Sequence, residues 1–298
     1  MRGPRTERVA VAGGDLVVHL LNRAPVGAPT LVALHSISSN GLSWQPVADL
    51  LEGEVGVVAP DMRGRAESAG LRSGGLADHA ADVLAIADHF GLARPLVSGH
   101  SMGAFAAVLA AATYPERTAA VVLVDGGVAF PTPSTAEVDA VLASVIGPAM
   151  DRLRMTFEDE HAYLDYWRSH RGLAPYLHGP GSGYLRAFLL HDLVGASGAL
   201  RSSSSLECVR ADWGDMTSDP ATLAAVHALQ CPAHLLWANR GLLDEPQGLY
   251  TTERLEAARL PDDIAVTQLS TNHYGTLLEP HAVVEVARAI RDLAPLAR

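Results

Sequence analysis

Short apolar segments, β-branched or alternating with polar residues, fill much of the first sixty residues and are separated by Gly, Pro and Asn. Segments of this kind predict β-strands. Further along, apolar positions from Leu76 to Phe90 recur at helical spacing, and Gly91 ends that pattern. The predicted strands lie at residues 8–12, 16–21, 31–34, 55–59, 95–98 and 119–124, and the predicted helices at 76–90 and 104–113.

This alternation predicts a mostly parallel sheet flanked by helices, because parallel strands need crossover connections and helices make them. From residue 130 to residue 229 the pattern changes and predicts no strand. Helices are expected there at 136–145, 149–157, 161–170, 184–193 and 220–229, before strands at 232–238 and 264–269 and a last helix at 281–293. We therefore expect one α/β core, residues 1–129 and 230–298, with a helical cap inserted at 130–229.

The composition is that of a folded globule. Apolar residues make up 48% of the 298 residues and charged residues 18%, which argues against disorder. The longest apolar runs, 104–112 and 119–124, are shorter than the roughly 18 residues of a membrane span. The net charge of −11 disfavours nucleic acid and anionic membranes as partners, and the lack of lysine excludes Schiff-base and P-loop chemistry. Two cysteines without CxxC spacing and no signal-peptide core predict a cytoplasmic location.

The segment Gly99-His100-Ser101-Met102-Gly103 stands between a predicted strand and a predicted helix. A serine at such a tight turn has a strained backbone, and only residues without bulk fit two positions before and after it. The turn exposes the hydroxyl at the carboxyl end of the sheet, and the helix start offers free backbone N–H groups to a developing oxyanion. Ser101 is therefore the candidate nucleophile.

With this segment the chain resembles the α/β-hydrolase superfamily over nearly its whole length. The motifs that carry the resemblance are Leu34-His35-Ser36-Ile37, Ala59-Pro60-Asp61-Met62-Arg63-Gly64, the 99–103 segment, Tyr114-Pro115-Glu116-Arg117 and Asn272-His273-Tyr274. The resemblance implies an oxyanion hole formed by the amides of Met102 and Ile37. Ser36 stands where the family usually has glycine.

A serine hydroxyl needs a base to accept its proton, and histidine titrates in the appropriate range. Of the thirteen histidines, His273 follows the last predicted strand in a polar loop, which is where the superfamily places its base. His35 and His100 are interpreted as packed, hydrogen-bonded residues beneath the site. No histidine pair has zinc-site spacing, and the resemblance implies neither a metal nor another cofactor.

Two aspartates are candidates for the acid that orients His273. Asp125 follows the strand at 119–124 directly, whereas Asp244 is the first acid after the strand at 232–238, in a register where the family usually has its aspartate earlier. Both keep the order Ser, acid, His. We favour Asp125 and keep Asp244 as the alternative. Asp61 is interpreted as part of a structural turn.

These residues predict a serine hydrolase that cleaves an ester or lactone through an acyl-enzyme. A serine at the turn argues against the superfamily's epoxide hydrolases and dehalogenases, which carry aspartate there. A thioesterase, a carbon–carbon bond hydrolase and a perhydrolase remain alternatives on the same triad, and a non-catalytic ligand-binding protein is a further one. Aromatic residues in the expected cap favour a medium-sized hydrophobic substrate, with Ser36, Tyr163 and Trp167 as candidate binding residues.

Overall fold

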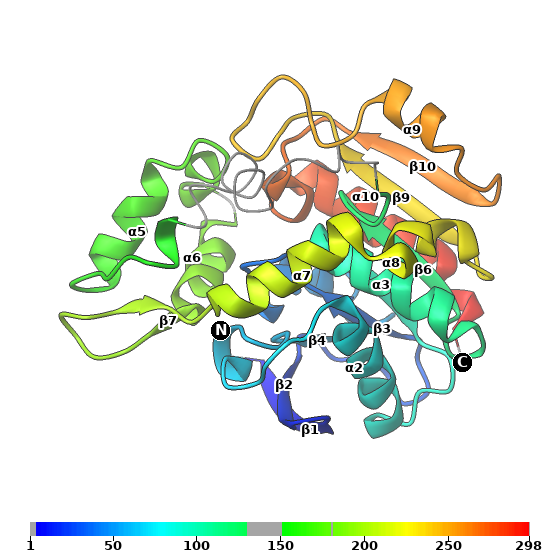
Figure 1. Cartoon of the computed structure of the whole chain (residues 1–298), viewed down its shortest axis with the longest axis horizontal. Helices are drawn as coiled ribbons and strands as arrows, with labels where there is room; N and C mark the ends of the chain where they lie inside the picture. Colours follow the sequence, from blue (N-terminus) through cyan, green and yellow to red (C-terminus); the bar gives the residue numbers. More distant parts are fainter. Residues whose placement is uncertain (1–3, 130–150, 180, 298) are drawn as a thin grey trace.

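An eight-stranded sheet forms the centre of the molecule (Figure 1), for which the computed structural model describes residues 4–129, 151–179 and 181–297. Its strands are β1 (Arg5–Val11), β2 (Gly14–Leu20), β3 (Thr30–Leu34), β4 (Gly56–Pro60), β5 (Leu96–His100), β6 (Ala120–Val124), β9 (Ala233–Ala238) and β10 (Ile264–Leu269). The order is β1-β2-β4-β3-β5-β6-β9-β10. The hairpin β1–β2 joins β4 antiparallel, and all other neighbours are parallel. All eight strands expected for the core are confirmed.

Helices cover both faces of the sheet (Figure 1). The helices around the sheet are α1 (Gln45–Leu50), α2 (Leu76–His89), α3 (Met102–Thr113), α7 (Leu206–Ser218), α8 (Pro220–Ala224), α9 (Thr252–Ala258) and α10 (Pro280–Leu293). Because side chains alternate along a strand, Val97 packs with α2 and α3 while its neighbour Leu96 packs with α1 and α10. The central strands β5 and β6 are buried at every position, which explains why β6 is apolar throughout.

A segment between β6 and β9 has its own apolar cluster. Residues 151–204, which we call the insertion segment, contain α5 (Glu160–Arg168), α6 (Ser182–His191) and the hairpin β7 (Leu193–Val194) and β8 (Arg201–Ser202). Its buried apolar side chains form a cluster of their own, and they are Phe157, Tyr163, Leu164, Trp167, Leu173, Leu185 and Leu189. The expected helices at 161–170 and 184–193 are confirmed, and the two short strands were not expected.

Two helices within the predicted cap, which ends at residue 229, pack on the core. Helices α7 and α8 pack against α3, and Val209 and Trp213 belong to the same apolar cluster as α2 and α3. No helix was expected between residues 193 and 220, where the structure has α7, whose first turn Ser205 caps by accepting from the Cys208 N–H. The predicted start of the cap at residue 130 and the helix at 136–145 lie outside the described residues.

No helix in the described ranges is both long and apolar enough to cross a membrane.

Candidate active site

Ser101 occupies a sharp turn between β5 and α3. Its backbone has φ 56° and ψ −120°, a conformation that non-glycine residues rarely adopt and that costs free energy. A Cβ added at Gly99 would lie 2.0 Å from the Gly103 carbonyl, and a Cβ at Gly103 would lie 2.4 Å from the Leu34 carbonyl oxygen. Both glycines are therefore required on steric grounds, as the spacing of the motif predicts.

His273 and Asp125 are 148 positions apart in the sequence and form a direct hydrogen bond. Asp125 directly follows β6 and is fully buried, and its Oδ2 accepts a hydrogen bond from His273 Nδ1 at 2.6 Å. Its other oxygen, Oδ1, accepts from the backbone N–H of Ala238 at 3.0 Å. The carboxylate is thus fixed at both oxygens, and it fixes the imidazole so that Nε2 is the nitrogen left for another partner.

Asp244, the alternative acid, lies in a different environment. Its Oδ1 is 2.6 Å from the Arg240 guanidinium and also accepts from the Asn272 side-chain amide at 3.3 Å. Its side chain is 29% exposed, whereas that of Asp125 is inaccessible. The structure therefore brings Asp125 to His273, and it places Asp244 in a surface ion pair.

The histidine next to the nucleophile supports His273 from below. His100 Nε2 donates to the backbone carbonyl of His273 at 3.0 Å, and the two rings stack with centroids 4.5 Å apart. Burial, followed by the neighbouring His273, lowers the pKa of His100 well below its ordinary value. His100 therefore stays neutral near pH 7 and serves as a fixed hydrogen-bond donor.

The loop after β3 lies directly against the start of α3, since a Cβ at Gly103 would be 2.6 Å from the His35 carbonyl oxygen. His35 Nδ1 donates to the Ser36 carbonyl at 2.7 Å, and His35 Nε2 accepts from the Met62 N–H at 2.9 Å. Burial lowers the pKa of His35 to about 3, so the neutral ring can donate at one nitrogen and accept at the other. Ile37 lines the same cavity as Ser101, and Met102 directly follows Ser101 in the chain.

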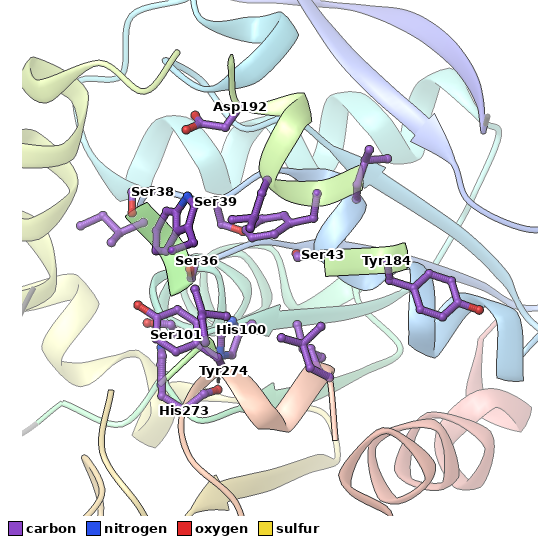
Figure 2. Close-up of a pocket in the computed structure, with 18 of the residues that line it drawn as sticks. Ser36, Ser38, Ser39, Ser43, His100, Ser101, Tyr184, Asp192, His273 and Tyr274 are labelled. Carbon is purple, nitrogen blue, oxygen red and sulfur yellow. Dashed lines mark hydrogen bonds between the residues drawn. The ribbon is translucent and has the colours of Figure 1, made fainter. Parts of the chain in front are cut away.

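Ser101 and His273 line one wall of a cavity of about 870 Å³, open mouth included (Figure 2). The insertion segment contributes Tyr163 and Trp167 to the lining of this cavity. Ser36 lies beside Ser101 (Figure 2). The apolar lining residues are Ile37, Leu42, Pro46, Trp167, Leu173, Phe188, Leu189, Leu242, Leu277 and Leu278. The candidate binding residues Ser36, Tyr163 and Trp167 therefore line the same cavity as Ser101 and His273.

A buried ion pair in the insertion segment was not anticipated from the sequence. Arg152 pairs with Asp192 in the cavity wall, and Tyr163 donates its hydroxyl hydrogen to Asp192 at 2.7 Å. The Arg152 guanidinium also lies over the Trp167 ring, 5.1 Å from its centroid. Residues 40 positions apart give no local signal of pairing, so only the fold reveals this polar end of the cavity.

A second unanticipated group joins the insertion segment to the sheet. Asp61, fully buried after β4, has its Oδ2 2.8 Å from Nε2 of His191 in α6 and 3.1 Å from Nε2 of His19 in β2. The backbone N–H of Gly41 binds its other oxygen at 2.9 Å. Asp61 therefore ties loops together, as the sequence analysis interpreted it, and it also holds the end of α6.

The contact of His191 with Asp61 makes the stability of the protein depend on pH. Burial alone lowers the pKa of His191, but the hydrogen bond and charge of Asp61, with the charges of Glu67 and Asp192, outweigh it and raise the pKa. A group with a raised folded-state pKa stabilises the fold below its unfolded pKa of about 6.5 and loses that contribution as the pH rises through the folded pKa. We expect His191→Gln to have a lower free energy of unfolding than wild type at pH 6. This difference should become smaller toward pH 9.

Urea unfolding at both pH values measures this difference in the free energy of unfolding. His161→Gln is the matched control, because His161 pairs with Asp165 on an exposed helix surface, where such pairs contribute little. A gap that stays constant between pH 6 and pH 9 would contradict the assigned ion pair.

Comparisons with known proteins agree with the fold described above. A family model described as the alpha/beta hydrolase fold matches residues 29–162. Lipase LipV of Mycobacterium tuberculosis is 31% identical over 128 residues, which are 43% of this chain and 49% of the lipase. The match thus spans about half the length of that curated relative.

Two solved structures match almost the entire chain. The crystal structure of E-2-(acetamidomethylene)succinate hydrolase has a TM-score of 0.74 at 20% identity and covers 96% of this chain and 99% of its own. The thioesterase domain from the curacin biosynthetic pathway has a TM-score of 0.74 at 19% identity, with 97% and 99% covered. At such identities the likeness shows the fold. The chain therefore has the α/β-hydrolase fold, and residues 29–162 match the family model of that fold.

Proposed function

We propose that the protein is a serine hydrolase that cleaves an ester or lactone of a medium-sized, mainly hydrophobic substrate through the triad Ser101, His273 and Asp125. The observation that carries the proposal is the 2.6 Å hydrogen bond between Asp125 and His273, with His273 facing the same cavity as Ser101. A carboxylate that binds Nδ1 holds the imidazole in the tautomer a general base requires. The strained Ser101 backbone further supports a functional role at this turn.

In the proposed mechanism His273 Nε2 takes the proton of the Ser101 hydroxyl as its oxygen attacks the carbonyl carbon. The developing oxyanion accepts hydrogen bonds from the amides of Met102 and Ile37. His273 then protonates the leaving oxygen, and the bond to the alcohol breaks. In the second half His273 takes a proton from water, the hydroxide attacks the acyl-enzyme, and Ser101 leaves with that proton.

The cavity supports the substrate class. Most of its lining surface is apolar, as in sites that bind small hydrophobic molecules. The insertion segment forms one wall, so we infer that it acts as a cap that determines which acyl or alcohol groups fit. The Arg152–Asp192 pair has no net charge, and it makes one end of the cavity suited to a neutral polar group of the substrate.

A fluorophosphonate probe tests the proposed function, because it bonds covalently to activated serine hydroxyls. We expect one probe per protein, and we expect peptide mass spectrometry to locate it on Ser101. Turnover of p-nitrophenyl esters of increasing chain length, beside a lactone and a thioester, then defines the substrate class. A protein that stays unlabelled, or that carries the probe on another residue, would refute the assignment of the nucleophile.

A further inference from the structure

Four carbonyl groups at the end of β3 and in the loop after it accept hydrogen bonds from side chains, three of which come from outside the loop. The bonds run from Trp44 Nε1 to Leu34 O (3.0 Å), from His35 Nδ1 to Ser36 O (2.7 Å), from Arg65 Nε to Ile37 O (2.9 Å) and from Arg152 Nη2 to Ser38 O (3.0 Å). Neither the Ile37 nor the Ser38 amide bonds to a residue that the structure describes. In a trans peptide the C=O and N–H point in opposite directions, so each held carbonyl fixes the direction of the next amide.

Arg65 is the donor among these four that contacts both residues of the proposed oxyanion hole, Ile37 and Met102. Its Nε binds the Ile37 carbonyl, and its Nη2 lies 3.8 Å from Sδ of Met102. Its Nη1 donates to the Arg63 carbonyl at 2.6 Å and lies 2.6 Å from Asp212 in α7. Arg65 is fully buried, so this planar group has one fixed orientation between the loop and α3.

We propose that Arg65 is a positioning residue of the oxyanion hole, which holds the Ile37–Ser38 peptide so that its carbonyl points away from the substrate oxygen. The inference rests on the proposed function. Without the guanidinium that peptide is free to rotate, and a carbonyl turned toward the hole would repel the oxyanion that the Ile37 amide binds. Arg65 acts through this peptide and does not contact the substrate itself.

The same turn provides a matched control. Arg63 is also buried, and it forms a two-pronged ion pair with Asp82 at 2.7 Å for each bond. Its remaining bonds go to the carbonyls of Ala12 and Arg72, so it does not touch the loop after β3. Arg63 and Arg65 thus have similar burial and similar aspartate partners, and they differ in the contact with the oxyanion loop.

Lysine replacements keep a cation for each aspartate but lose the planar group that reaches several acceptors at once. We expect Arg65→Lys to lower kcat by about 10- to 100-fold, somewhat less than the loss of one oxyanion donor, with KM within about twofold of wild type. The inhibition constant of a trifluoromethyl ketone, whose hemiketal oxyanion occupies the hole, should rise by a similar factor. Arg63→Lys should lower Tm while kcat and the inhibition constant stay near wild type.

Two outcomes would overturn the role of Arg65: wild-type kcat in Arg65→Lys, or equal losses of kcat in Arg65→Lys and Arg63→Lys at equal losses of Tm. If Arg65→Lys does not fold, Arg65→Met combined with Asp212→Asn removes both charges and leaves neither buried alone, and the same constants are measured on it. A wild-type enzyme that does not react with the fluorophosphonate would instead refute the proposed function, so the two failures are distinguishable.

Discussion

Ser101→Ala is expected to abolish ester hydrolysis while the protein remains folded. The substitution removes the proposed nucleophile and only one oxygen atom, and loss of a triad member costs several orders of magnitude in rate in serine proteases. The hydroxyl of Ser101 faces a cavity rather than packed side chains, so its removal opens no new void in the core. We expect kcat to fall by at least 10³-fold, as measured with a p-nitrophenyl ester on protein with unchanged circular dichroism.

Ser43→Ala is a suitable control for this experiment. Ser43 also lines the cavity, but it belongs to the segment before α1 and lies away from His273 (Figure 2). It should retain most of the wild-type rate. More than a tenth of the wild-type rate in Ser101→Ala would exclude Ser101 as the nucleophile.

Asp125→Asn is expected to lower kcat by about 10³- to 10⁴-fold on the serine-protease precedent. An asparagine can still accept from the Ala238 N–H through its oxygen, but its amide then points an N–H at His273 Nδ1. Nδ1 of the imidazole then accepts this hydrogen bond through its lone pair, so the neutral ring carries its proton on Nε2. A protonated Nε2 cannot accept the proton of the Ser101 hydroxyl. The lost negative charge also removes the stabilisation of the imidazolium.

The paired variant Asp244→Asn should keep most of the activity, because Asp244 bonds to Arg240 and Asn272 and not to His273. Tm is measured beside kcat for both variants. Asparagine tolerates the positive φ of 45° at position 125, so we expect Asp125→Asn to remain folded at the assay temperature. A nearly inactive Asp244→Asn beside an active Asp125→Asn would assign the acid to the later strand.

Local pattern was sufficient to determine the sheet. Each of the eight strands is a short segment, apolar or alternating with polar residues, between turn residues, and the wholly apolar sequence of β6 favours an interior position. The Ser101 turn was predictable for a similar reason, since the clash at Gly99 and Gly103 arises between residues four positions apart or in the adjoining strand. The position of His273 followed from the order of the elements and from the resemblance to the superfamily.

The tertiary structure decided the features that depend on contacts between distant residues. The sequence offered two aspartates that follow strands and did not decide which of them orients His273. Folding brings Asp125 to His273, 148 positions away in the sequence, and pairs Asp244 with Arg240. Residues 206–218 were expected within the cap and without a helix, whereas packing places α7 against α2 and α3.

The buried arginines illustrate the same limit. In sequence Arg63 and Arg65 are two similar residues of one turn, yet one binds Asp82 and the other reaches Ile37 and Asp212. Long-range packing determines the direction of a side chain and the partners within its reach. Hydrophobic periodicity carries no information about these contacts. The sequence by itself thus determined where the reactive groups stand along the chain, and the fold alone determined which neighbours hold them in place.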